Sequence, residues 1–303
     1  MDTVQIEDVT KTFGEHTAVD SLSLTVPTGS IYGFIGPNGS GKTTTLRMIM
    51  GIFYPDMGAI RVFVNKHQGA RSERIGYLPE ERGLYRKMKV RELLRFYGGL
   101  KSNRSVKEEV DMWLEKLDLT KWADSKVEAL SKGMSQKVQF ISAVVTKPEL
   151  LILDEPFSGL DPVNADLLKD VILELQKKGA TIIFSTHDMS MAEKMCDYIF
   201  MIYQGRKVLD GTLTHIQEQY GNDTIQIQSE VGASALKGIA GIEKVNDFGK
   251  LQEVRVSSGA DPQEILIELL KKTRISRFEI AKPSLNDIFI RIASPERKEA
   301  HHE

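Results

Sequence analysis

Apolar and polar residues alternate along two segments near the start of the chain, residues 4–13 and 22–26. This period of two predicts strands of an antiparallel sheet. Residues 31–36 form an apolar run that ends in Gly-Pro-Asn-Gly, which predicts a buried strand entering a loop, and residues 42–50 then predict a helix. Short strands are also expected at residues 58–64 and 75–78.

The period changes to that of helices between about residues 88 and 147. Strand patterns return at 150–153 and 181–185, and an apolar stripe from Val163 to Leu175 predicts a helix between them. Strands that alternate with helices imply an α/β fold with a mostly parallel sheet. The pattern therefore predicts this sheet together with an antiparallel β subdomain and a helical subdomain at about 88–147.

A turn at residues 220–223 is followed by shorter segments, which predict a small α+β domain. We therefore expect a first domain at 1–221, an accessory domain at 222–294 and a polar, disordered tail at 295–303. The accessory domain shows no chemistry in its sequence. Its expected core residues are Ile225, Val254, Val256, Leu266 and Phe289.

Composition narrows the classes of function. The 303 residues carry a formal net charge of −2, which disfavours a dedicated nucleic-acid binder. One cysteine, Cys196, excludes an intrachain disulfide framework and a multi-cysteine zinc site. No apolar run approaches the ~20 residues that span a bilayer, and we expect no signal peptide.

The loop after the third predicted strand carries the first chemistry. Residues 36–43 match G-x-x-x-x-G-K-[ST] between a strand and a helix, where backbone N–H groups surround phosphates. Lys42 is expected to reach the β- and γ-phosphates and Thr43 to ligate Mg²⁺. The expected nucleotide-binding residues here are Gly36, Pro37, Asn38, Gly39, Ser40, Gly41, Lys42, Thr43 and Thr44, with Lys42 also counted as catalytic.

Two adjacent carboxylates end the apolar strand at 150–153. Asp154 is placed to hold Mg²⁺, and Glu155 to polarise an attacking water. Two acids after a strand can also serve only as a helix cap, but the phosphate loop in the same chain favours the catalytic interpretation.

At this point the chain resembles the ATP-binding cassette (ABC) ATPases, over about residues 3–220. The sequence Leu130-Ser131-Lys132-Gly133-Met134 resembles the L-S-G-G-Q signature of that family, with Lys132 and Met134 as departures. The resemblance implies that Ser131 and Gly133 face ATP bound by a second subunit, so that two ATP molecules are sandwiched between two chains. Independently of the family, Ser131 predicts a helix N-cap.

Four further residues gain roles from the resemblance. Asp161, in Ser158-Gly159-Leu160-Asp161, matches the D-loop, and His187 matches the switch histidine at the γ-phosphate. Phe13 stands where the family carries an aromatic that stacks on adenine, although a buried strand residue is an equally plausible interpretation. Glu80 replaces the usual Gln that ligates Mg²⁺ and senses the membrane partner.

The string from Tyr77 to Tyr85 and the ending Pro283–Phe289 are similar to bacterial type-2 exporter ATPases, including sodium-extrusion systems. This likeness implies an ATP-hydrolysing subunit that drives a separate integral membrane permease. It also implies a pair of ATPase subunits, which we expect to be a homodimer, peripheral on the cytoplasmic face of the cell membrane. ATP and Mg²⁺ are the expected cofactors, and no nucleic acid is expected.

The alternative is a soluble mechanical ABC ATPase acting on the ribosome or on nucleic acid. Translation factors of this kind fuse two cassettes, whereas this sequence has one phosphate loop and one signature. Chromosome-organising relatives insert long coiled coils or zinc modules, and neither pattern is present in the sequence. A phosphate-loop kinase has no reason to carry a signature or a D-loop.

Overall fold

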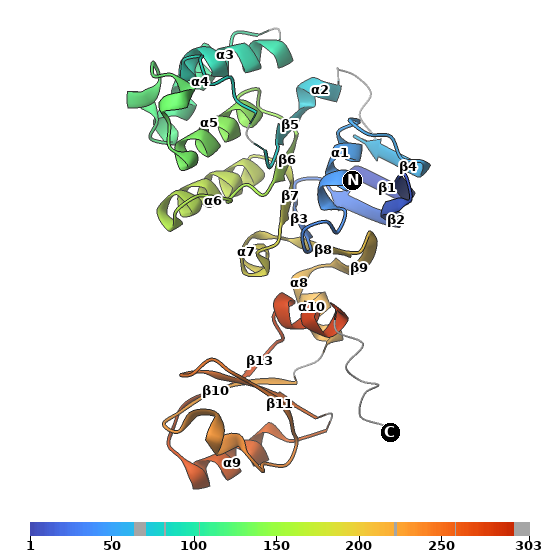
Figure 1. Cartoon of the computed structure of the whole chain (residues 1–303), viewed down its shortest axis with the longest axis vertical. Coiled ribbons are helices and arrows are strands. Elements are labelled where there is room, and N and C mark those ends of the chain that lie inside the picture. The colour runs from blue at the N-terminus through green and yellow to red at the C-terminus, as the bar shows by residue number, and fades with distance from the viewer. Residues whose placement is uncertain (64–70, 82, 103, 221–222, 258, 294–303) are drawn as a thin grey trace. The chain divides into compact units, whose positions relative to one another are not determined.

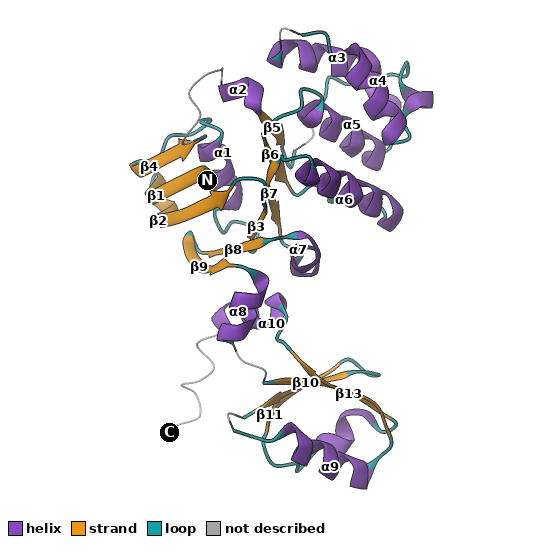
Figure 2. Ribbon diagram, turned by 180° about the vertical axis from the view of Figure 1, so that it is seen from behind, coloured by secondary structure: helices purple, strands orange, loops and turns teal. Residues whose placement is uncertain are grey.

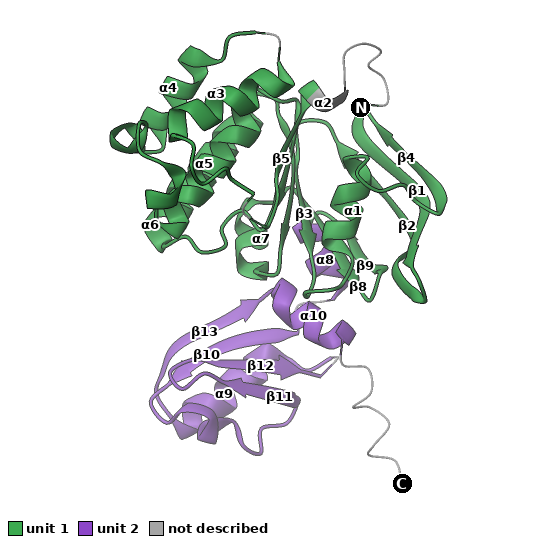
Figure 3. Ribbon diagram, turned by 45° about the horizontal axis from the view of Figure 1, so that its top comes forward, with its two compact units in different colours: residues 1–212 green, residues 213–303 purple. Residues whose placement is uncertain are grey.

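The computed structural model describes residues 1–63, 71–81, 83–102, 104–220, 223–257 and 259–293. The chain divides into two compact units, Met1–Thr212 and Leu213–Glu303, which Figure 3 shows in different colours. The expected tail at 295–303 and the turn residues 221 and 222 lie outside the described residues.

The first unit contains two sheets. The three-stranded antiparallel sheet has the order β2-β1-β4, built from β1 (Asp2–Phe13), β2 (His16–Pro27) and β4 (Met57–Val62). The six-stranded sheet has the order β5-β6-β7-β3-β8-β9. Its strands are β3 (Ile31–Ile35), β5 (Ile75–Leu78), β6 (Leu150–Asp154), β7 (Thr181–Thr186), β8 (Tyr198–Tyr203) and β9 (Arg206–Gly211). Only β9 pairs antiparallel, so the expected mostly parallel sheet is confirmed.

Helices cover this sheet on both sides, as Figures 1 and 2 show. One side holds α3 (Val90–Lys101), α4 (Lys107–Lys116), α5 (Lys132–Val144) and α6 (Pro162–Lys177), and the other holds α1 (Lys42–Ile49) and the antiparallel sheet. The remaining helical segments are α2 (Arg71–Arg74), α7 (Met189–Met195) and the 3₁₀ turns η1 (Thr120–Trp122) and η2 (Val127–Ala129). The expected helical subdomain corresponds to α3–α5.

Strand β6 shows why both layers form. Leu151 and Leu153 join the core beneath α3–α6, whereas Leu150 and Ile152 join the core beneath α1 and the antiparallel sheet. Successive side chains of a strand point to opposite faces, so a parallel strand covered on both faces has to be apolar throughout. The continuous run Leu150–Leu153 meets this requirement, and its carboxyl end delivers Asp154.

The second unit is a separate α+β domain with its own core. Its antiparallel sheet has the order β11-β12-β10-β13. The elements are α8 (Leu213–Gln219), β10 (Thr224–Ser229), η3 (Gly232–Leu236), β11 (Ile242–Asp247), β12 (Gln252–Val256), α9 (Pro262–Lys272), β13 (Ile275–Ala281) and α10 (Leu285–Ala293). None of the helices in the described part of the chain is long and apolar enough to cross a membrane.

Two details of the second unit differ from expectation. The division lies between Thr212 and Leu213 rather than near 221, since Gln217 of α8 donates a hydrogen bond of 3.1 Å to the Pro283 carbonyl. In the core, Ile225, Val254 and Val256 are buried as expected. Leu266 and Phe289 are only partly buried, because α9 and α10 turn other residues inward: Ile265, Leu269, Leu285 and Ile288.

Candidate nucleotide-binding site

The phosphate loop joins β3 to α1, and its glycines are required by backbone geometry. Gly36, Gly39 and Gly41 have φ values of +153°, +77° and +108°. A Cβ on Gly36 would lie 2.2 Å from the Ile202 carbonyl oxygen, and one on Gly41 would lie 2.5 Å from the Ala18 carbonyl oxygen. Side chains at these positions would therefore push the loop away from β8 and β2.

Lys42 is held inside this loop. Its Nζ donates to the carbonyls of Gly36 at 2.7 Å and Pro37 at 3.0 Å, and the residue is 6% exposed. Burial lowers the pKa of the Lys42 amine, while the negative charges of Glu155, Asp154 and Glu80 act in the opposite direction. The cation thus lies within electrostatic range of all three carboxylates.

Asp154 ends β6 with one carboxylate oxygen engaged and one buried without a partner. The Ser185 hydroxyl on the neighbouring strand β7 donates to Oδ1. Oδ2 has no hydrogen-bond partner among the described residues, although Asp154 is 1% exposed. A buried carboxylate oxygen left without a protein donor is suited to a bound cation.

Glu155 follows in the left-handed region, with φ of +49°. Its Oε1 accepts a hydrogen bond of 3.1 Å from the backbone N–H of His187 and lies 2.7 Å from His187 Nδ1. Non-glycine residues adopt such backbone angles rarely, and they concentrate at functional sites. The conformation turns the Glu155 side chain from the end of β6 toward the end of β7, while the imidazole of His187 stays 63% exposed.

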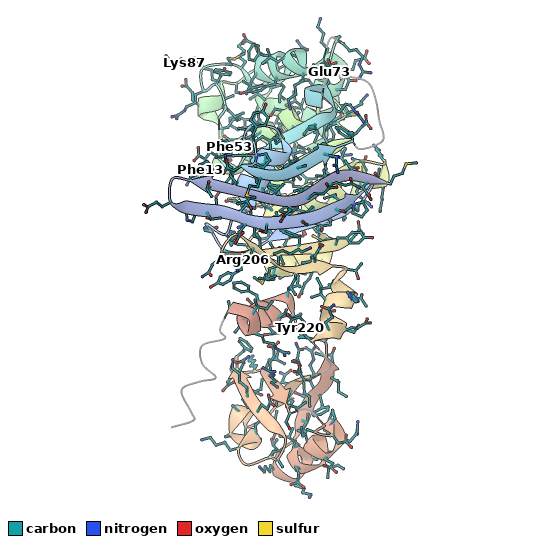
Figure 4. All side chains as sticks on the ribbon, turned by 90° about the vertical axis from the view of Figure 1, so that its right-hand side faces the viewer. Phe13, Phe53, Glu73, Lys87, Arg206 and Tyr220 are labelled. Carbon is teal, nitrogen blue, oxygen red and sulfur yellow. The ribbon has the colours of Figure 1, made fainter. Side chains whose placement is uncertain are left out.

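Phe13 lies at the end of β1. Its ring packs edge-on against Phe53, with 5.5 Å between ring centroids, and it is 45% exposed. Figure 4 labels both aromatic residues. Because nearly half of the Phe13 side chain is accessible, the buried-strand interpretation is wrong for this residue, and a stacking surface remains available.

These parts converge on one pocket of about 430 Å³. Its lining contains ten of the expected residues: Phe13, Asn38, Gly39, Gly41, Lys42, Thr43, Thr44, Glu80, Asp154 and Glu155. Gly36 and Pro37 contribute the carbonyls that hold Lys42, and Ser40 keeps a buried Oγ without a partner in the described structure. His187 stands beside Glu155, outside the lining.

Two lining residues, His16 and Ala18, lie outside the motifs that the sequence shows. His16 pairs directly with Phe13 across the β1–β2 turn, which places both beside the pocket. The sequence itself indicates this pairing, because Gly14-Glu15 is a two-residue connection of the kind that joins antiparallel strands.

The signature residues lie outside the pocket of their own chain. Ser131 caps α5, and its Oγ accepts a hydrogen bond of 3.2 Å from the Met134 N–H, as its sequence position predicts. Gly133 lies near Leu160 in the D-loop segment, and Asp161 caps α6 by accepting from the Asn164 N–H at 3.0 Å. The lining of the pocket, as far as the structure describes it, includes none of Ser131, Gly133 and Asp161.

The side chains present also fit Mg²⁺. Thr43, Glu80 and Asp154 line one pocket and offer oxygen ligands, which this cation prefers. Among the described residues no group of three or more His, Cys, Asp or Glu side chains could hold a metal alone. A bound Mg²⁺ would therefore depend on nucleotide oxygens for part of its coordination.

The fold and the site define a phosphate-loop nucleoside triphosphatase. Comparisons with known proteins identify its family. The family model "ABC transporter" matches residues 19–158, and the model "ATP-binding protein DrrA1-3-like, C-terminal domain" matches residues 211–293. The chain is 44% identical over 290 residues to an uncharacterized ABC transporter ATP-binding protein, YhaQ, of Bacillus subtilis (strain 168), covering 94% of this chain and 96% of that protein.

It is also 34% identical over 308 residues to the Nod factor export ATP-binding protein I of Rhizobium sp. (strain N33), covering 97% of each chain. Among solved structures, the ATP-binding subunit of an ABC transporter matches 72% of this chain and 93% of its own, with a TM-score of 0.67 and 30% identity. The chain belongs to the ABC transporter ATP-binding proteins and is an ATPase coupled to transport. The resemblance that the signature indicated is confirmed.

Proposed function

We propose that this protein hydrolyses ATP at the pocket between the phosphate loop and the carboxyl ends of β6 and β7, and thereby drives a membrane exporter. The observation that carries the proposal is the meeting of Lys42, Asp154 and Glu155 at one pocket, with His187 against Glu155. These groups supply a phosphate-binding cation, a metal ligand and a base for water attack.

The position of each residue in the pocket determines its role in ATP hydrolysis. Phe13 stacks on the base, and the N–H groups of the phosphate loop hold the phosphates. Glu155 orients the attacking water and takes its proton, while the His187 backbone N–H holds Glu155 Oε1 in place. Mg²⁺, held by Thr43, Asp154 and Glu80, would neutralise charge on the phosphates. Most of the catalysis is positioning and electrostatic stabilisation of the phosphoryl group.

The working assembly is a homodimer with two ATP molecules. The signature and D-loop residues lie outside the pocket of their own chain, which leaves Ser131, Gly133 and Asp161 available to ATP held by a second copy. Closure of this sandwich follows ATP binding, and hydrolysis reopens it. The second unit, the accessory domain, regulates the ATPase or stabilises the dimer.

The permease docks beside the segment from Glu80 to Arg95. An aromatic cluster with centroid separations of 5.8–6.2 Å is formed by Tyr85 of this segment and by Phe96 and Tyr97, which follow it. Tyr85 is 56% and Phe96 is 42% exposed, so the cluster offers an apolar surface to a membrane subunit. The name of the rhizobial relative, a Nod factor export protein, supports the export direction. In this proposal the chain works on the cytoplasmic face of the membrane, bound to the permease.

The test replaces Glu155 with Gln, which keeps the shape and removes the base. We expect Glu155→Gln to bind ATP normally and to lose steady-state hydrolysis by about a hundredfold or more. It should also accumulate as a dimer in ATP, measured by size-exclusion chromatography with light scattering. Asp170→Asn changes an exposed carboxylate of α6, and it serves as the matched control that should behave as wild type.

Near-normal turnover by Glu155→Gln would refute Glu155 as the base.

The permease is tested by purifying tagged Glu155→Gln protein with ATP in mild detergent. We expect an integral membrane protein to copurify in a ratio of two copies to two. Ribosomes or DNA in its place would favour the mechanical ATPase instead.

A further inference from the structure

Helix α5, which begins at the signature, also holds the loop that carries Glu80. The side chain of Gln139, on the second turn of α5, is 3% exposed. Its Nε2 donates hydrogen bonds to the carbonyl oxygens of Pro79 at 3.3 Å and Glu81 at 3.1 Å. These two carbonyls flank Glu80, so one buried amide fixes the backbone on both sides of a pocket residue.

The chemistry of the two contacts settles how the amide is turned. Both partners are carbonyl acceptors, so the NH₂ group and not the oxygen of Gln139 has to face them. The other end, Oε1, is buried with no hydrogen-bond partner among the described residues. A buried acceptor without a donor costs free energy. The two hydrogen bonds that its NH₂ group donates are therefore the contacts that stabilise this orientation of the Gln139 amide.

Two neighbouring contacts tie the same helix to the same site. Gln136, one turn earlier on α5, donates from Nε2 to the Pro156 carbonyl at 3.0 Å, directly after Glu155. Later on α5, the Ala143 carbonyl lies so near β5 that a Cβ added to Gly76 would approach it to 2.3 Å. Helix α5 therefore contacts β5 and the segments after β5 and β6 at three points along its length, and these segments carry Glu80 and Glu155.

We propose that Gln139 is a positioning residue that makes the signature helix and the Glu80 loop move as one body. The proposal rests on the proposed function, in which Glu80 helps to hold Mg²⁺ at the nucleotide and Ser131 reaches the ATP of the second copy. The side chain of Glu80 is exposed, so the backbone on either side of it determines where its carboxylate points. A rigid α5 then carries any shift of that backbone to Ser131, and through it to dimer closure.

The test separates nucleotide binding from closure. Gln139→Glu keeps the shape of the side chain but replaces the donor with an acceptor that repels both carbonyls. Gln139→Met keeps the length without a polar group, and it serves where the charged variant fails to fold. Each is measured for ADP affinity, for kcat and KM of ATP hydrolysis, and for ATP-driven dimerisation in the Glu155→Gln background.

We expect both variants to bind ADP with wild-type affinity, because Phe13 and the phosphate loop are unchanged. The kcat should fall by about tenfold while KM changes by less than about twofold. At saturating ATP, the dimers should need about tenfold more protein to form. If Gln139 had a purely structural role, the variants would have a lower melting temperature but the wild-type kcat, KM and ATP-driven dimerisation.

Gln176→Glu is the matched control. Gln176 also donates from Nε2 to a backbone carbonyl, that of Gly29 at 2.9 Å, but it lies on α6 away from the pocket. Gln139 variants that match this control in kcat and in dimerisation would overturn the inference. If Glu155→Gln itself hydrolyses ATP normally, the proposed function fails instead, so the two failures are distinguishable.

Discussion

At the scale of single residues, Phe13 is the proposed stacking surface for the base. Its ring is braced by Phe53 and by the Lys11 ammonium, which lies 5.4 Å from the ring centroid. Stacking of a base on an aromatic ring contributes about 1–3 kcal/mol. On this proposal we expect the accessible part of the ring to contribute a substantial share of nucleotide affinity.

We expect Phe13→Ala to raise the dissociation constants of ATP and ADP alike by about tenfold, because both carry the same base. The kcat at saturating ATP should stay near wild type. Equilibrium binding of a fluorescent nucleotide measures the change, with Phe13→Tyr as the control that keeps a ring. A fall in kcat with unchanged affinity would contradict the stacking role.

Asp56 gives a prediction in pH. Hydrogen bonds from Lys11 Nζ, the Thr12 N–H and the Thr12 hydroxyl lower the pKa of Asp56 from 3.8 to about 2. A carboxyl with a lowered folded-state pKa adds stability that is complete above its unfolded pKa and is lost as the pH falls through the folded value. The contribution of Asp56 is therefore complete near neutral pH.

We expect the difference in unfolding free energy between wild type and Asp56→Asn to be constant above about pH 5 and to shrink between about pH 4 and pH 2. Urea titrations at a series of pH values measure it. A difference that stayed constant down to about pH 3 would show that the Asp56 carboxylate is not responsible.

At the scale of elements, the contact between β5 and α5 leaves no room for a side chain at Gly76. A Cβ there would meet Ala143 O at 2.3 Å, Pro148 Cγ at 2.8 Å and Leu151 Cδ1 at 2.9 Å. By contrast, a Cβ on Gly99 of α3 would have no atom within 4 Å. The two glycines thus form a matched pair, one confined and one free.

We expect Gly76→Ala to lower the free energy of unfolding by about 1–3 kcal/mol, because α5 has to move away from the strand. Gly99→Ala should leave it unchanged or raise it by up to about 1 kcal/mol, as alanine favours a helix. Chemical denaturation followed by circular dichroism measures both. Equal effects at the two positions would refute the close packing of β5 on α5.

At the scale of the whole molecule, each compact unit has its own apolar core. The core of the second unit joins β10 and β12 to α9 through residues that belong to that unit alone. A unit with its own core can fold independently. Its division from the first unit precedes α8, which makes residue 213 the natural start of an isolated domain.

We expect residues 213–293 produced alone to unfold cooperatively, and residues 1–212 alone to bind ATP. A fragment beginning at 222 should be less stable, since it lacks the hydrogen bond from Gln217 to Pro283. Thermal melts followed by circular dichroism compare the two C-terminal fragments. Equal melting temperatures would contradict the assignment of α8 to the second unit.

The sequence by itself determined the local chemistry and most of the elements. The glycines of the phosphate loop, the apolar run that ends at Asp154 and the cap at Ser131 depend on neighbours along the chain, so spacing alone predicts them. The inward face of α9 was misassigned near Leu266, because one helical stripe does not reveal which sheet residues it meets.

Only the tertiary structure decided which distant groups share a site. It placed His187 on Glu155 and Gln139 against the carbonyls around Glu80. These contacts depend on strand order and helix packing, which bring together residues that no local period connects. The same packing keeps Ser131, Gly133 and Asp161 out of the lining of the pocket, a result that no spacing along the chain could give.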